Sequence, residues 1–183
     1  MKSKNLLICL IALLLLLPLT AAYATVKVTN FAGDFVFLLA SSGAVGSAKE
    51  IESDGRFVAY DNGTVKDTKT GLMWASKDNG EGINWKGAKR YCEHYRGGGY
   101  TDWRMPTIDE LSGLYGKSES YQAKLGSYDV NLTKLIQLTA CCPWASETLG
   151  STAAGFYFYT GHRIWFGRSG SCRRRALPVR GGN

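Results

Sequence analysis

The sequence predicts an α+β domain with two short helices and an antiparallel sheet. Two segments, residues 85–95 and 107–115, carry apolar residues at helical spacing. A hairpin signal at Asn62-Gly63 precedes them, and several short strand-like segments follow in the last third of the chain. Because the helices are grouped and do not alternate with the strands, an antiparallel sheet is favoured over a parallel one.

The first 24 residues have the pattern of a cleavable signal peptide. Lys2 and Lys4 precede an apolar run at residues 6–17, and small residues end the segment at Ala24. The run is shorter than the roughly 20 residues that a membrane-spanning helix needs. We therefore expect cleavage after Ala24 and an exported protein without a transmembrane anchor, located in the periplasm, on the cell surface or in the medium.

Residues 25–54 are expected to form an N-terminal extension or linker. Residues 35–40 (FVFLLA) have the composition of a buried strand, whereas residues 41–47 are rich in Gly and Ser. The compact domain is expected over residues 55–183.

The domain is predicted to begin with a hairpin. Residues 56–60 and 64–66 are strand-like, and Asn-Gly between them favours a tight turn because both residues tolerate positive φ. A second turn at residues 68–71 leads to a third strand-like segment at residues 72–75.

Both helices have recognisable starts. Asn84 is expected to cap the first, whose apolar stripe runs from Trp85 to Tyr95 and ends at three glycines. Thr107 and Glu110 have capping-box spacing for the second. The YTDWRMPTIDEL segment between them is interpreted as a structural corner and not as the rim of an active site. We assign structural roles to Trp74, Trp103, Arg104, Pro106, Thr107, Glu110 and Trp144.

The remainder is expected to contain one more short helix and several strands. Residues 117–129 are expected to form a loop and residues 131–138 a short helix. The strand-like segments are residues 144–147, 156–160, 163–166 and 176–180, with a turn at residues 161–162.

Four cysteines remain after cleavage: Cys92, Cys141, Cys142 and Cys172. In an exported protein this even count suggests disulfides, with three possible pairings. A bond between the neighbours Cys141 and Cys142 is disfavoured, because adjacent Cα atoms lie about 3.8 Å apart and most disulfides span about 5.5–6 Å. We expect each to reach a distant partner, and leave the pairing open. No metal site is expected, since CxxC-like spacing is absent.

The C-terminal region is rich in arginine. Residues 161–183 contain six arginines, one histidine and no carboxylate, in a chain of net charge +7. Guanidinium groups bind sulfate, phosphate or carboxylate in forked pairs, and nearby aromatic rings can stack on sugars. The candidate residues for binding an anionic glycan are Arg163, Arg168, Arg173, Arg174, Arg175 and Trp165. The alternative is a solvated basic edge that prevents pairing between sheets.

Nothing in the sequence has the spacing of a catalytic centre, so no enzymatic activity and no cofactor are expected. His94 and His162 are the only histidines, and Trp144-Ala145-Ser146-Glu147 lacks the glycines of a nucleophile elbow. A structural calcium ion at Asp61-Asn62 or Asp78-Asn79 is a less favoured alternative, because turns explain these pairs equally well.

Several phrases together resemble the bacterial Lcl C-terminal domain family, named for a collagen-like protein of Legionella. They are GTVKDTKTGLMWAS, NWKGAKRYCEHYRGGGYTDWRMPTIDELSGLY, CCPWASE, FYFYTGHRIWF and RALPVR, within residues 56–180. The resemblance implies a C-type-lectin-like fold used for binding, and in the namesake it implies adhesion and sulfated polysaccharides. This chain has no Gly-X-Y repeat, and it lacks the cysteine that many members carry in the last strand. Neither a collagen-driven trimer nor a disulfide pairing is therefore carried over.

The sequence thus predicts an exported, non-catalytic module that binds anionic or sulfated glycans through its arginine-rich C-terminal region. The alternative is a structural or assembly subunit of the cell envelope whose partner is a surface protein. Extracellular nucleic acid is a third and less favoured partner. The oligomeric state is left open.

Overall fold

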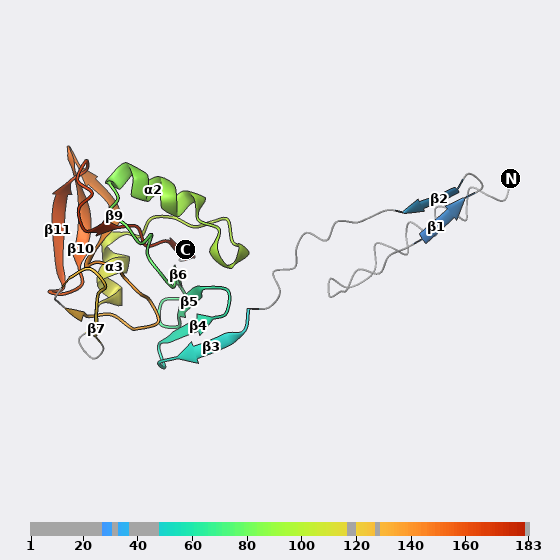
Figure 1. Cartoon of the computed structure of the whole chain (residues 1–183), viewed down its shortest axis with the longest axis horizontal. Coiled ribbons are helices and arrows are strands. Elements are labelled where there is room, and N and C mark those ends of the chain that lie inside the picture. The colour runs from blue at the N-terminus through green and yellow to red at the C-terminus, as the bar shows by residue number, and fades with distance from the viewer. Residues whose placement is uncertain (1–26, 31–32, 37–47, 117–119, 127–128, 182–183) are drawn as a thin grey trace. The chain divides into compact units, whose positions relative to one another are not determined.

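The computed structural model describes residues 27–30, 33–36, 48–116, 120–126 and 129–181 (Figure 1). The chain divides into two units, Met1–Ala44 and Val45–Asn183. In the first unit, β1 (Lys27–Asn30) and β2 (Gly33–Val36) form an antiparallel hairpin. The expected signal peptide lies outside the described residues, as does most of the strand expected at residues 35–40. No helix among the described residues is both long and apolar enough to cross a membrane.

A five-stranded antiparallel sheet forms one part of the second unit. Its order is β13-β6-β5-β4-β3. The strands are β3 (Glu50–Ser53), β4 (Phe57–Tyr60), β5 (Thr64–Asp67), β6 (Met73–Ala75) and β13 (Val179–Arg180). The predicted hairpin joins β4 to β5, with Gly63 at φ 78° and the Asn62 side chain accepting from the amide of Thr64. Because β3 pairs with β4, the sheet begins before residue 55, inside the segment expected to be a linker.

A four-stranded sheet in the order β11-β10-β9-β12 forms the other part. Its strands are β9 (Cys142–Leu149), β10 (Thr152–Tyr157), β11 (His162–Gly167) and β12 (Arg174–Arg175). The first three are antiparallel, whereas β12 runs parallel to β9. The predicted antiparallel α+β class is confirmed, and the C-type-lectin-like relationship stays a prediction.

Helices α2 (Trp85–His94) and α3 (Ile108–Leu114) pack on opposite faces of this sheet. Successive residues of a strand point to opposite faces. Accordingly Ala145 and Ala154 join the core that contains α3, whereas Trp144 and Ala153 join the cluster that contains α2. The solvent-exposed face of α2 and that of α3 therefore lie on opposite sides of the sheet.

The segment before α3 is a structural corner. Trp103 is buried and donates its indole N–H to the carbonyl of Gly97 at 3.1 Å. The backbone of Arg104 exchanges hydrogen bonds with Val179 of β13. Thr107 and Glu110 form the predicted capping box, which is thereby confirmed.

The helix predicted at residues 131–138 is wrong. These residues form turns, yet Leu132, Leu135, Ile136 and Leu138 are buried in the main core. The apolar spacing reflects a loop that crosses the core and not a helical face. The remaining short elements are the 3-10 turn η1 (Gly97–Gly99), β7 (Tyr121–Gln122) and β8 (Asp129–Val130).

Candidate functional site

The arginines predicted to form one patch lie in different environments. Arg163 extends from β11 on the α3 side, where it pairs with Asp109 at 2.6 Å and donates to Ser112. Trp165 is on the same face of β11, two residues further on, and is half exposed. Both are separated by the sheet from the residues that contact α2.

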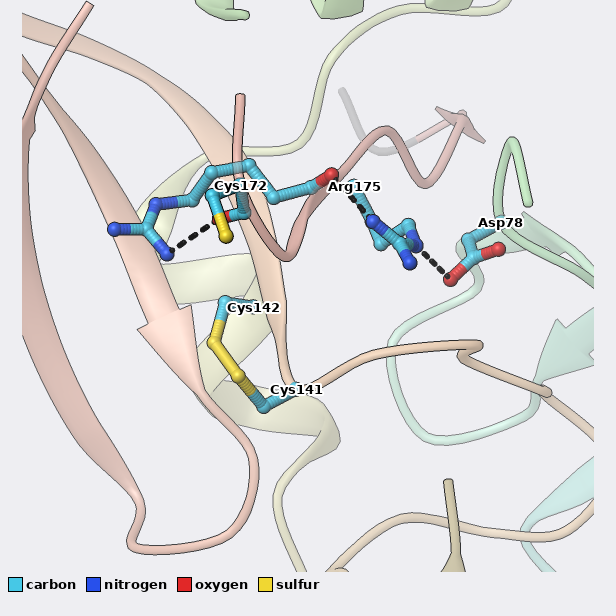
Figure 2. Close-up of a disulfide and its surroundings, with 6 residues drawn as sticks. Asp78, Cys141, Cys142, Cys172 and Arg175 are labelled. Atoms are coloured by element: carbon cyan, nitrogen blue, oxygen red, sulfur yellow. Dashed lines mark hydrogen bonds and ion pairs between the residues drawn. A yellow bond between two sulfur atoms is a disulfide. The ribbon is translucent and has the colours of Figure 1, made fainter. Parts of the chain in front are cut away.

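Arg175 is buried, so its assignment to a ligand site is wrong. Its side chain is 1% exposed, and Nε donates to Thr139 Oγ1 at 2.6 Å and lies 3.5 Å from Asp78 Oδ2 (Figure 2). Burial raises the pKa of Asp78, against the opposing effect of hydrogen bonds from Thr139 and Gly80 and of the Arg175 charge. Arg175 therefore connects β12 to the segments that contain Thr139 and Asp78, and it is not available to a ligand.

Arg168 and Arg174 pack on aromatic rings of the α2 side. The guanidinium of Arg168 lies 4.5 Å from the centre of the Trp85 ring, and that of Arg174 lies 3.3 Å from the centre of the Phe166 ring. Partial burial lowers the pKa of Arg174. Arg173 is exposed, with φ 54°, in the turn that the amide of Arg174 closes on the carbonyl of Ser171.

The segment from Arg168 to Arg174 is fixed beside the start of α2. The amide of Trp85 donates to the carbonyl of Arg168 at 3.1 Å, and the amide of Ile83 donates to that of Arg174 at 3.3 Å. At Gly82, a Cβ would lie only 2.7 Å from the carbonyl oxygen of Ser171, so a side chain has no room there. Glycine at this position permits the close approach of the two segments.

A groove runs along the exposed face of α2, and three basic residues of the helix line it. Lys86, Arg90 and His94 are spaced four residues apart, so they project from the same face. We call this the α2 groove; it has a volume of about 830 Å³. Its lining residues are Gly82, Ile83, Asn84, Lys86, Gly87, Arg90, Tyr91, His94 and Ser171.

The local sequence explains this orientation of α2. The Asn84 side chain caps the helix by accepting from the amide of Gly87 at 2.8 Å, as predicted. Ala88 and Cys92 face the sheet and are fully buried, which turns the basic residues outward. The candidate residues predicted from the sequence did not include Lys86 and Arg90. The sequence did contain a pattern that could have identified this basic face, namely basic residues at positions i, i+4 and i+8 of the predicted helix.

The cysteines pair differently from the prediction. Cys141 and Cys142 are joined by a disulfide, with their Cα atoms 3.7 Å apart (Figure 2). Cys92 and Cys172 are free. The prediction rested on the short distance between the Cα atoms of neighbouring residues, but the bond forms across that distance. Cys141 lies in a bend before β9, which begins at Cys142, so strand alternation does not separate the two sulfur atoms. Cys92 is fully buried, and burial raises its pKa to about 12.

The oxygens considered for calcium have partners within the chain. Asp61 Oδ1 accepts from the amide of Lys49, Asn62 Oδ1 from Thr64, and Asn79 Oδ1 from the amide of Ala176. Together with the Asp78 contacts, these bonds show that both residue pairs stabilise turns and connections between segments.

The structure therefore defines a small α+β domain with a basic surface groove. Residues 63–180 match the model of the Lcl C-terminal domain family, and the chain belongs to that family. The resemblance inferred from the sequence motifs is thus confirmed. Membership points to a secreted or surface-exposed module. A comparison with curated proteins finds no match.

Proposed function

We propose that this domain is a non-catalytic binding module that acts outside the cytoplasm, and that its α2 groove binds acidic polysaccharides, including sulfated glycans. The ligand class is the one suggested by the arginine-rich sequence, but the site lies on α2. The arginines beyond β11 contribute only where they face this helix.

The observation that carries the proposal is the pair of unneutralised cations in the groove. Lys86 and Arg90 are both exposed, and neither forms an ion pair with a carboxylate among the described residues. None of the residues that line the groove is acidic. A polyanion that enters it gains charge-assisted hydrogen bonds without displacing an internal partner.

The neighbouring groups fit a sugar polymer. Tyr91 presents a partly exposed ring in the groove, and Ser171 adds a polar group on the opposite wall. Arg168 and Arg173 belong to the segment beside that wall, where they increase the positive potential around the site. His94 and Ser171 share no hydrogen bond within the described structure, and Nδ1 of His94 lies 2.9 Å from the carbonyl oxygen of Arg90. We therefore assign both residues to binding and not to catalysis.

Retention on immobilised heparin, measured as the salt concentration of elution, tests the proposal. Replacing both groove cations (Lys86→Gln with Arg90→Gln) should weaken binding at least about tenfold, because each lost charge-assisted bond is worth about 1 kcal/mol or more. The matched control is Lys66→Gln with Lys69→Gln, which removes the same charge from exposed positions in and after β5. Equal weakening by the two double variants would show non-specific attraction by net charge and contradict a site on α2.

Competition experiments distinguish the ligand class. Dextran sulfate should release the protein from heparin, whereas neutral dextran should not. Stronger competition by single-stranded or duplex DNA than by dextran sulfate, at equal charge concentration, would favour a nucleic-acid partner over a glycan.

An assembly role is the second candidate, and exposed apolar side chains favour it. Trp165 on the edge strand β11 is 50% exposed, and Leu149 at the end of β9 is 68% exposed. Both lie away from the α2 groove. A concentration-dependent increase of mass in light scattering, abolished by Trp165→Ser, would support an interface here, and a constant monomer mass would count against it.

A further inference from the structure

We propose that Cys172 exchanges with the Cys141–Cys142 disulfide, so that the protein interconverts between this bond and a Cys142–Cys172 bond. The exchange concerns sulfur atoms only and does not depend on the ligand of the α2 groove.

The sheet places Cys172 next to this disulfide. Strand β12 pairs in parallel with β9, with Arg174 opposite Cys142. Cys172 lies two residues before Arg174, inside the turn that begins at Ser171. Figure 2 shows its thiol directed toward Cys142, with the three sulfur atoms in the order Cys172, Cys142, Cys141. Of the two disulfide sulfur atoms, that of Cys142 is therefore the one that faces Cys172.

The exposure of the three residues fits their roles in an exchange. Cys172 is free and exposed, so its thiol is open to solvent. Cys141 and Cys142 are buried, which protects their bond from external thiols but not from a thiol in the adjoining turn of the same chain. The other free cysteine, Cys92, is buried, which disfavours its thiolate.

The step balances without an added oxidant or reductant. The Cys172 thiolate attacks Sγ of Cys142, an S–S bond forms between them, and the bond to Cys141 breaks. The electron pair of that bond leaves with the sulfur of Cys141, which takes a proton from water. Among the four cysteines that the structure describes, the product has one disulfide and two free thiols, as does the starting form.

The exchange changes how the arginine-bearing turn is held. In the starting form the turn from Ser171 to Arg174 is connected to β9 by backbone pairing at β12. In the exchanged form a covalent bond joins the same turn to the first residue of β9. Because Ser171 lines the α2 groove, the two forms present different walls to a ligand.

Peptide mapping under non-reducing conditions tests the inference. The protein is incubated at about pH 8, where a substantial fraction of an ordinary thiol is ionised. It is then quenched in acid, blocked with N-ethylmaleimide and digested with trypsin. Residues 169–173 (SGSCR) and residues 135–163, which contain Cys141 and Cys142, fall in separate peptides. Exchange predicts a covalent complex of these two peptides that carries one blocked cysteine and disappears on reduction.

The same peptide map can also show that no exchange takes place. If every SGSCR peptide carries the maleimide after prolonged incubation, and the 135–163 peptide is two hydrogens lighter than its reduced form, no exchange occurs. Cys92→Ala should leave the exchanged fraction unchanged, because its thiol takes no part. Loss of the cross-linked peptides in that variant, with the fold retained by circular dichroism, would also contradict the proposal.

A matched pair of variants establishes which sulfur is attacked. With glutathione disulfide as the oxidant, Cys141→Ser should form the bond to Cys172 at least several-fold faster than Cys142→Ser, because Cys142 lies nearer to Cys172. Equal rates, or a faster bond through Cys141, would contradict the geometry that we propose. If either variant fails to fold, fragmentation of the wild-type cross-linked peptides between Cys141 and Cys142 shows which of the two carries the maleimide.

Discussion

Arg104 and Glu110 form a forked ion pair that joins the start of α3 to the C-terminal strand. Nη1 of Arg104 donates to Oε2 of Glu110 at 2.8 Å, and Nη2 donates to Oε1 at 2.6 Å. Nη2 of Arg104 also donates to the carbonyl of Gly181, just beyond β13. Glu110 in turn accepts from the amide of Thr107 at 2.8 Å, so a single carboxylate serves both the helix cap and the corner.

Glu110→Gln should destabilise the domain by about 1–3 kcal/mol, because hydrogen bonds to charged groups contribute more than neutral ones. Urea unfolding at neutral pH measures this change. Glu93→Gln is the control, since Glu93 pairs with Lys89 on the exposed face of α2 and such pairs contribute less than about 1 kcal/mol. Equal effects of the two changes would contradict the role assigned to Glu110.

The effect of Glu110→Gln should also depend on pH. Burial acts to raise the pKa of Glu110, but hydrogen bonds from Arg104 and Thr107 outweigh it, so the folded-state pKa lies below the ordinary value. A lowered folded-state pKa means that the stabilisation is complete above the unfolded-state pKa of about 4.3 and is lost as the pH falls through the folded value. Wild type and variant should therefore converge in stability below about pH 4.

Asp78→Ala should cost about 3–5 kcal/mol, because it leaves the guanidinium of Arg175 buried without its countercharge. Asp102→Ala is the control: Asp102 pairs with Arg180 at 2.7 Å, but its side chain is 58% exposed, so the cost should stay below about 1 kcal/mol. Thermal unfolding of both variants provides the comparison. A small effect at Asp78 would show that Arg175 reaches solvent, which would restore it as a candidate ligand residue.

Two glycines should respond in opposite ways to alanine. A Cβ at Gly155 of β10 would lie 2.8 Å from the Phe166 ring and 3.1 Å from the carbonyl oxygen of Pro143, so Gly155→Ala should cost about 1–3 kcal/mol through overpacking. Gly113 lies within α3 and has open space around it, so Gly113→Ala should stabilise the protein by up to about 1 kcal/mol. Unfolding midpoints that shift in the same direction would contradict this packing.

Much of the local structure was predictable, because its causes lie within a few residues of the chain. Asn84 and Thr107 cap their helices with their own side chains, and the Asn62-Gly63 turn is closed by the amide of Gly63 donating to the carbonyl of Tyr60. The helix expected at residues 131–138 failed because buried apolar residues recur at similar spacing in a loop that crosses a core.

The candidate site was only partly predictable. The sequence predicted a basic region in an exported binding domain, but Lys86 and Arg90 were overlooked because they lie far along the chain from the arginine-rich end. Hydrogen bonds between the residue 168–174 segment and the start of α2 bring the two regions together. Such proximity arises from pairing across long sequence separations and leaves no local pattern.

The sequence by itself determined the α+β class, the family, both helix caps and the first hairpin, since each follows from local composition and spacing. Only the tertiary structure decided how exposed three neighbouring arginines are. Arg173 is exposed, Arg174 is half-buried against Phe166, and Arg175 is buried beside Asp78. The tertiary structure also decided that Cys141 bonds to Cys142. The physical reason is that the residue at which a strand begins, and the segments packed on each of its faces, set the direction and surroundings of every side chain.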